Sequence, residues 1–261
     1  MSNDTNYALL NNSRFYILVS TFLLSVIVFG WLRLQITSDQ LFYIRLQQVF
    51  GLLCIVYWYV ALIISPLGYV IGKQRLRHIE FARRAIGVSA FYFALLHAAV
   101  ALWGQLGGLS QLSYLPSLFQ WSLAGGAVSL GILFIMAITS FDKVIKIMTF
   151  RYWKWVHRFV YVGGVLAILH IWSVGTHLSY SAIQVSALIA LIILSGLETY
   201  RLVTLLARKS EELSGKLYFW VIFASIWAAW IIAITGMPAL IQSYHGGGSG
   251  SHEKATHGNV H

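Results

Sequence analysis

Long apolar segments separated by short polar ones recur along the whole chain. A helix needs roughly 20 apolar residues to cross the hydrocarbon core of a bilayer, and the segments that reach or approach this length predict an all-α, polytopic membrane helix bundle of about seven transmembrane helices. Hydrophobic residues make up 58% of the chain and charged residues only 10%, which excludes an ordinary soluble domain. The expected spans lie near residues 15–36, 47–71, 84–104, 118–140, 153–174, 180–204 and 217–241.

The distribution of Lys and Arg predicts how the bundle is oriented. These residues gather in the connections near 72–84, 141–154 and 201–216, while the connections near 105–117 and 175–180 hold none. Because positive residues are retained on the cytoplasmic side, we expect the N-terminus inside and the C-terminal tail outside. No short hydrophobic stretch with a small-residue cleavage site precedes the first span, so this span is expected to be retained.

The two ends of the chain differ from the bundle between them. Residues 1–14 are polar and expected to be loosely ordered, residues 15–241 form the bundle, and residues 242–261 form a tail rich in Gly, Ser and His. The histidines of the tail could capture a transition metal, although its GGGSGS run also resembles an engineered linker. The formal charge of +10 is explained by topology and by anionic lipid, so no nucleic-acid partner is expected.

Two histidines lie deep in apolar spans, His97 in YFALLHAAVALW and His170 in GVLAILHIWSV. An unpaired polar group in hydrocarbon is costly, so each imidazole needs a partner. His97 follows Arg84 by thirteen residues and His170 follows Lys154 by sixteen. At about 1.5 Å per residue, both lie beyond the midplane at similar depth. Two neutral imidazoles at one level can ligate a b-type haem from its two faces; the alternative is that each bonds a carbonyl or hydroxyl of a neighbouring helix.

His157 shares the fifth span with His170 but not its depth. It lies three residues past Lys154, near the cytoplasmic interface, where a solvated histidine is common. Thirteen residues place the two histidines about 140° apart around an ideal helix and roughly 20 Å apart along it. They can share a face only if the helix is distorted, and Gly163-Gly164 is where a distortion would be tolerated.

Three segments resemble the ferric-reductase-like transmembrane domain, a family that includes NADPH oxidases, yeast-type ferric reductases and a haem-bearing bacterial membrane subunit. They are ARRAIGVSAFYFALLHAAVALW, the AITS at 137–140, and WKWVHRFVYVGGVLAILHIW, which opens with WxxxHRxxY. The likeness covers roughly residues 45–205 and is greatest to the subunit that serves the bacterial periplasmic methionine sulfoxide reductase. The resemblance implies a six-helix core plus one further helix, b-type haem, and a place in a bacterial inner (plasma) membrane.

Carried over residue by residue, the resemblance makes His97 and His170 ligands of an outer haem iron, and His157 a possible ligand of a second, inner haem iron. Two-haem members of the family carry a further histidine on the third helix, fourteen residues before the outer one. Arg83 stands at that position here, and His78 is nineteen residues before His97. The resemblance therefore implies one haem b and leaves a second open.

Four arginines are candidates for contacts with haem propionates, which need positive or hydrogen-bonding partners. Arg33 and Arg45 lie at the outer ends of the first two spans, against the positive-inside rule. The propionates of an outer haem would explain them, and so would snorkelling to lipid headgroups. Arg84 and Arg158 could serve an inner haem in the same way.

These features predict transmembrane electron transfer through b-type haem held by histidines. The chain has no phosphate-binding glycine loop and no soluble stretch long enough for a flavin or nicotinamide, so the expected donor is a cytoplasmic reductase or quinol. The outer-face acceptor is either ferric iron or another metal ion, which would make the chain a ferric-reductase-like oxidoreductase, or a periplasmic redox protein, which would make it an electron-transfer subunit.

The alternative from another class is a haem-free membrane scaffold or transporter with structural histidines. Glu198 is the only carboxylate within an apolar run. Proton-coupled pumps normally keep buried carboxylates along their route, so the pattern argues against transport.

Overall fold

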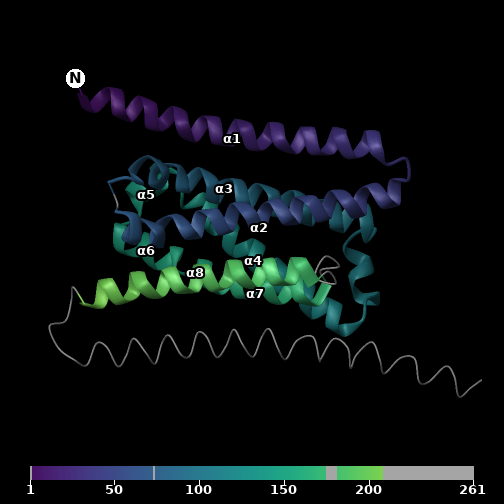
Figure 1. Cartoon of the computed structure of the whole chain (residues 1–261). Coiled ribbons are helices and arrows are strands. Elements are labelled where there is room, and N and C mark those ends of the chain that lie inside the picture. The colour runs from purple at the N-terminus through teal and green to yellow at the C-terminus, as the bar shows by residue number, and fades with distance from the viewer. Residues whose placement is uncertain (1, 73, 175–180, 208–261) are drawn as a thin grey trace, which may run out of the picture.

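Within residues 2–72, 74–174 and 181–207, which the computed structural model of the chain describes, every regular element is a helix (Figure 1). The all-α prediction is therefore confirmed, and so are the first six expected spans. The seventh, at 217–241, and the tail at 242–261 lie outside the described residues. The stretches long and apolar enough to cross a membrane are Ser13–Gln35, Asp39–Ile71, Ala82–Gln105, Ser117–Ile138, Arg151–Val174 and Val185–Leu205.

The connections between the helices gather at the two ends of the bundle. The α1–α2 connection and the segment that leads into α4 lie at one end, while α5 and α6 lie at the other (Figure 1). We call the first the outer end and the second the cytoplasmic end, following the orientation that the charges predict. In chain order the elements are α1 (Ser2–Gln35), α2 (Asp39–Ile71), α3 (Arg77–Ala99), a π-helical turn η1 (Val100–Gln105), a 3-10 helix η2 (Leu109–Tyr114), α4 (Ser117–Ile138), α5 (Asp142–Ile147), α6 (Phe150–His157), α7 (Phe159–Val174) and α8 (Ser181–Ala207).

Two helix pairs make up the centre of the bundle. Helix α2 packs along α3, and α4 packs along α7. Helix α1 lies against α3 on the outside of this centre (Figure 1), and α8 contacts α2. Helix α3 also contacts α4, so the pair that carries His97 lies beside the pair that carries His170.

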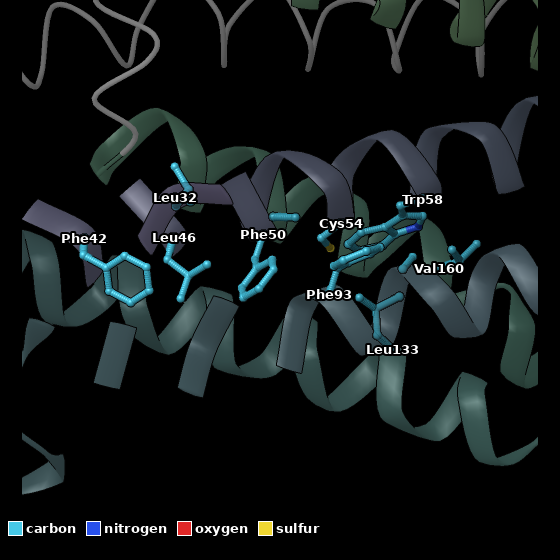
Figure 2. Packing of buried hydrophobic residues seen from close by; sticks show 11 residues of the cluster. Leu32, Phe42, Leu46, Phe50, Cys54, Trp58, Phe93, Leu133 and Val160 are labelled. Carbon is cyan, nitrogen blue, oxygen red and sulfur yellow. The ribbon is translucent and has the colours of Figure 1, made fainter. Parts of the chain in front are cut away.

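Side chains of α2 line the core over most of its length. They recur every four residues, so they follow one side of the helix, and each is at most 7% exposed. Phe93 of α3, Leu133 of α4 and Val160 of α7 complete the same cluster (Figure 2). The α2 residues of this row are Phe42, Leu46, Phe50, Cys54 and Trp58.

Trp58 ends this row and reaches across to α7. A Cβ atom added to Gly163 would lie 3.3 Å from Cη2 of Trp58 and 3.2 Å from Cγ2 of Ile132, so the glycine makes room for both side chains. The indole N–H of Trp58 has no hydrogen-bond partner among the described residues. An unpaired buried donor costs about 1–3 kcal/mol, so packing at this position carries a penalty.

Helix α2 begins earlier than its apolar run. The span predicted from the sequence starts near residue 47. The structure starts the helix at Asp39, with Ser38 as N-cap accepting a hydrogen bond of 3.5 Å from the backbone N–H of Leu41. Capping residues in the first turn outweigh the polar side chains that follow.

The polar N-terminal segment is helical, so the expectation that residues 1–14 are loosely ordered is wrong for residues 2–14. This segment contains neither glycine nor proline, and helix elongation is favourable once a nucleus exists. At its end, Nη1 of Arg14 lies 3.1 Å from Oδ2 of Asp142. The same carboxylate accepts from Nη1 of Arg84 at 2.8 Å, so Asp142 joins α1 and α3 at the cytoplasmic end.

The fifth span is interrupted at Arg158 rather than at Gly163-Gly164. Its backbone N–H donates to the Trp155 carbonyl at 3.1 Å, and its carbonyl accepts from the Tyr161 N–H at 3.2 Å. These three-residue steps tighten the chain between α6 and α7. Helix α7 runs unbroken through the two glycines, because the space beside Gly163 is filled by neighbouring side chains.

Glu198, the carboxylate in the sixth span, is paired. Its Oε2 lies 2.9 Å from Nη2 of Arg201, with side-chain exposures of 14% and 19%, and its Oε1 accepts a hydrogen bond of 2.9 Å from the Tyr161 hydroxyl. Arg201 also donates to the hydroxyl of Ser65 at 3.3 Å. The group joins α8 to α7 and α2, so Glu198 has a structural explanation.

Hydroxyl pairs attach α1 to α3, and one of them gives a test of the packing. Oγ1 of Thr21 lies 2.8 Å from Oγ of Ser89, and Oγ of Ser25 lies 2.9 Å from the Tyr92 hydroxyl.

Thr21→Val should lower the free energy of unfolding by about 0.6–1.7 kcal/mol, since the Ser89 hydroxyl is then buried without this partner. Unfolding in mixed micelles measures the change. The control is Thr37→Val, in the exposed α1–α2 connection; an equal loss in both variants would contradict the prediction.

Candidate functional site

His97 lies near the outer end of α3 and is held by the backbone of α2. Its Nδ1 is 2.8 Å from the carbonyl oxygen of Gln47. A carbonyl can only accept, so Nδ1 carries the proton and Nε2 keeps its lone pair. The ring reaches this carbonyl by passing over Gly51, where a Cβ would lie 2.9 Å from Nδ1. Any larger residue at this position would push the ring away.

His170 is held in the same way by α4. Its Nδ1 lies 3.0 Å from the carbonyl oxygen of Ser122, and a Cβ on Gly126 would lie 3.0 Å from Nδ1. The Ser122 hydroxyl also donates to the His170 carbonyl at 3.3 Å. Each histidine therefore bonds a carbonyl on the facing helix and lies over a glycine one turn further along that helix.

The two imidazoles come close together where the two helix pairs meet. Their ring centroids are 6.3 Å apart, and the ring planes make an angle of 80°. Metal–imidazole bonds are about 2.0 Å long, so two imidazoles on opposite sides of one metal ion have centroids about 6 Å apart. The observed separation thus fits one iron between the rings. The sequence predicted that the two histidines lie at a similar depth, and the structure brings their rings together.

The chemistry of the pair fits a bis-histidine haem. Histidines that ligate a metal commonly donate their other ring N–H to a backbone carbonyl, which fixes the tautomer and the ring orientation. Neither Nε2 has a hydrogen-bond partner among the described residues. A purely structural histidine would satisfy both nitrogens in an apolar span, so the open Nε2 atoms favour ligation.

His157 lies in a different environment at the cytoplasmic end. Its ring stacks on Trp153 with centroids 4.2 Å apart, and its Nε2 lies 3.2 Å from Oγ1 of Thr139. The indole N–H of Trp153 donates to the Thr139 carbonyl at 3.1 Å. These contacts tie α6 to the end of α4, and they engage the nitrogen that a second haem iron would need.

The described residues do not assemble a second histidine pair around His157. Arg83, at the position where two-haem members of the family would carry the partner histidine, donates from Nε to the Ala61 carbonyl at 2.8 Å. The side chain of His78 lies outside the description. Among the described contacts, His157 provides one imidazole for an inner haem. The inner haem therefore stays a prediction.

The four arginines proposed for propionates lie at the expected ends of the bundle. At the outer end, Arg33 pairs with Asp39 at 2.8 Å and lies 5.3 Å from the Phe42 ring centroid, while Arg45 donates to Oε1 of Gln48 at 3.1 Å. At the cytoplasmic end, Arg84 is bound to Asp142, and Arg158 is exposed at the α6–α7 junction. Their contacts to propionates stay predictions.

Sequence reasoning missed half of this site. Gly51 and Gly126 lie on the facing helices α2 and α4, and the sequence alone does not pair these helices with those that carry the histidines. The carbonyls of Gln47 and Ser122 carry no side-chain signal at all. A glycine four residues after the acceptor, on each facing helix, is the one trace the sequence contains.

Part of the chain matches a known protein family. Residues 48–168 match the family described as ferric reductase like transmembrane component. This part of the chain is therefore similar to ferric reductase-like transmembrane domains. The match contains His97, His157 and both ring-contacting glycines, and it ends two residues before His170.

Curated bacterial proteins are similar to part of the chain. The protein-methionine-sulfoxide reductase heme-binding subunit MsrQ of Ralstonia nicotianae is 31% identical over 112 residues, which are 42% of this chain and 50% of the relative. The subunit of the same name from Bordetella pertussis is 30% identical over 132 residues, or 50% of this chain and 60% of the relative. The chain thus spans about half the length of the relatives it matches. No solved structure matches the chain significantly.

The glycine contacts generate a test of the site. Gly51→Ala and Gly126→Ala should each weaken haem binding about 10–100-fold, the usual cost of disturbing a group that orients a metal ligand. The added methyl displaces the ring and breaks its bond to the carbonyl. Haem titration of the apoprotein, followed by absorbance, measures the affinity.

Gly131→Ala is the matched control for this test. Gly131 lies on α4 with nothing within 4 Å of its would-be Cβ, so this variant should bind haem normally. Unchanged haem affinity in both Gly51→Ala and Gly126→Ala would contradict the proposal that these glycines make room for the imidazole rings.

Proposed function

We propose that this chain is an integral membrane protein that carries single electrons across the membrane through a b-type haem ligated by His97 and His170. One observation carries the proposal. Two imidazoles, each with Nδ1 bound to a backbone carbonyl and Nε2 unbonded among the described residues, lie with centroids 6.3 Å apart in the apolar part of the bundle. Haem in a protein of this kind supplies a one-electron couple.

The residues of the chain hold and orient the group. The carbonyls of Gln47 and Ser122 keep each imidazole in the tautomer that presents Nε2. Gly51 and Gly126 let the rings approach the facing helices. The buried apolar cluster of α2, α3, α4 and α7 runs along the centre of the bundle, so the iron would lie in surroundings of low dielectric constant.

The architecture and the relatives support a donor and two candidate acceptors. Since no flavin or nicotinamide domain is expected in the chain, electrons enter from a cytoplasmic reductase or from quinol. The relatives named as heme-binding subunits of a protein-methionine-sulfoxide reductase support a periplasmic redox protein as acceptor. Direct reduction of ferric or other metal ions is the second candidate, supported by the ferric reductase-like domain. The location we propose is the bacterial inner (plasma) membrane, with the N-terminus inside.

A haem-free scaffold or transporter is the rival function. The pairing of Glu198 with Arg201 and Tyr161 removes the one intramembrane carboxylate from consideration as a free proton carrier. A visible spectrum of the purified full chain decides between the two functions. A Soret band with sharp α and β bands after dithionite reduction is expected, and their absence from a haem-replete preparation would refute electron transfer through haem.

Substitution of the ligands gives the sharper prediction. His97→Ala and His170→Ala should each abolish the bis-histidine spectrum, because the iron loses one of its two axial nitrogens. Pyridine haemochrome assays of wild type and variants measure the bound haem per chain.

His157→Ala serves as the comparison and counts the haems. With one haem, this variant keeps the wild-type haem content, whereas loss of about half would support an inner haem on His157. A wild-type spectrum in the His97 or His170 variant would remove these residues from the site.

A further inference from the structure

The hydroxyl of Ser122 makes two contacts with His170. Its Oγ lies 3.3 Å from Nδ1 of the ring and 3.3 Å from the backbone carbonyl oxygen of the same histidine. That carbonyl can only accept, so the hydroxyl donates its proton there, and its oxygen is left to accept from the ring N–H. The Ser122 carbonyl, 3.0 Å from Nδ1, accepts from the same N–H. The ring N–H of His170 is therefore shared between two oxygens of one residue.

This hydroxyl connects the imidazole of His170 to the backbone of the same residue. A rotation of the ring about its side-chain bonds would break the contact at Nδ1, while the contact at the backbone carbonyl keeps Oγ in place. Ser122 is only 7% exposed, and a hydroxyl that donates a hydrogen bond is polarised and becomes a better acceptor. The orientation of the ring therefore depends on the Ser122 side chain as well as on its carbonyl.

The two histidines differ in this respect. Among the described residues, Nδ1 of His97 has one acceptor, the Gln47 carbonyl at 2.8 Å, whereas Nδ1 of His170 has a carbonyl and a hydroxyl. The additional acceptor belongs to a side chain, so a substitution can remove it and leave the carbonyl in place. A change at Ser122 therefore acts on one ring of the pair.

A second serine of α4 shows what an interhelical bond does without a histidine. Serine in a helix commonly donates to a carbonyl of its own helix, as Ser173 does to Leu169 at 2.7 Å. Ser129 instead donates across to the Gly163 carbonyl of α7 at 3.0 Å. It follows Ser122 by seven residues, two turns along the same face of α4. Both serines join α4 to α7, and the contact with an imidazole is the feature that Ser122 adds.

We propose that Ser122 is a positioning residue whose hydroxyl fixes the plane of the His170 imidazole and lowers the midpoint potential of the iron between His97 and His170. This inference rests on the proposed function. An imidazole whose N–H donates to a second oxygen is a stronger electron donor, which favours ferric over ferrous iron. In this couple one electron passes from a one-electron reductant, which is oxidised, to ferric iron, which becomes ferrous. No bond is made or broken at Ser122 and no proton leaves it.

Removal of the hydroxyl from the full-length, haem-loaded protein tests this role. Ser122→Ala keeps the backbone carbonyl and should raise the ratio of ferrous to ferric iron at a fixed ambient potential about three- to tenfold, an upward shift of about 30–60 mV for a one-electron couple. A redox titration followed at the α band measures the shift. The electron paramagnetic resonance signal of low-spin ferric iron depends on the angle between its imidazole planes, which is 80° here, so its g values should change in the same variant.

Three further variants make the comparison specific. Ser122→Cys fills a similar volume with a thiol that hydrogen-bonds weakly, so it should behave like the alanine variant. Ser122→Thr keeps a hydroxyl and should keep the wild-type potential. Ser129→Ala removes the matched bond between α4 and α7 and should leave the potential and the g values unchanged. The haem content per chain, measured by pyridine haemochrome, should equal that of the wild type in every variant.

Several results would overturn this role of the Ser122 hydroxyl. Wild-type potentials and g values in the alanine and cysteine variants would do so, and so would an equal shift in Ser129→Ala, which would indicate a general loosening of the helix pair. A shift in the alanine but not the cysteine variant would assign the effect to a void, and loss of haem from both would assign the hydroxyl to haem binding. Absence of haem from the wild-type protein would refute the proposed function instead.

Discussion

The hydrogen bond between an imidazole N–H and a backbone carbonyl of the facing helix is the constraint on which the site depends. In an apolar span, an imidazole without partners is costly, and a helix carbonyl is the one acceptor available at any position. Using it fixes which nitrogen remains free. The bond also demands that the two helices approach closely, and the glycines at positions 51 and 126 permit that approach. This hydrogen bond, which each of the two histidines makes, thus determines the tautomer, the orientation of the ring and the spacing of the helices.

The cytoplasmic half of the bundle has a different character. There the interior is filled by Trp58, Leu133 and Val160, all at most 6% exposed, and His157 is engaged by Thr139 and Trp153. The two halves have similar lengths of helix and both contain histidine. They differ in the side chains that lie against their glycines. In the outer half Gly51 and Gly126 lie against the histidine rings, whereas in the cytoplasmic half Gly163 lies against Trp58 of α2.

The sequence was most informative where one physical effect dominates. Hydrophobic length placed six spans, since hydrocarbon thickness admits few alternatives, and the rise per residue brought His97 and His170 to one depth. Prediction failed where neighbouring helices decide the outcome. The early start of α2 depends on the cap at Ser38, and the continuity of α7 through Gly163 depends on the neighbouring side chains that fill the space beside this glycine. The carbonyl acceptors for the two histidines could not be read from side chains, because every residue has one.

The pairing of helices gives the site a further meaning for assembly of the protein. His97 and its carbonyl belong to the α2–α3 pair, and His170 and its carbonyl to the α4–α7 pair, the two most closely packed pairs of the bundle. Each half-site can therefore be completed within one pair of helices as it inserts, before the pairs meet. A metal that needs a nitrogen from each would then join two preformed units, and its binding energy would count toward folding of the whole. In such a protein, cofactor supply acts as a checkpoint on membrane assembly.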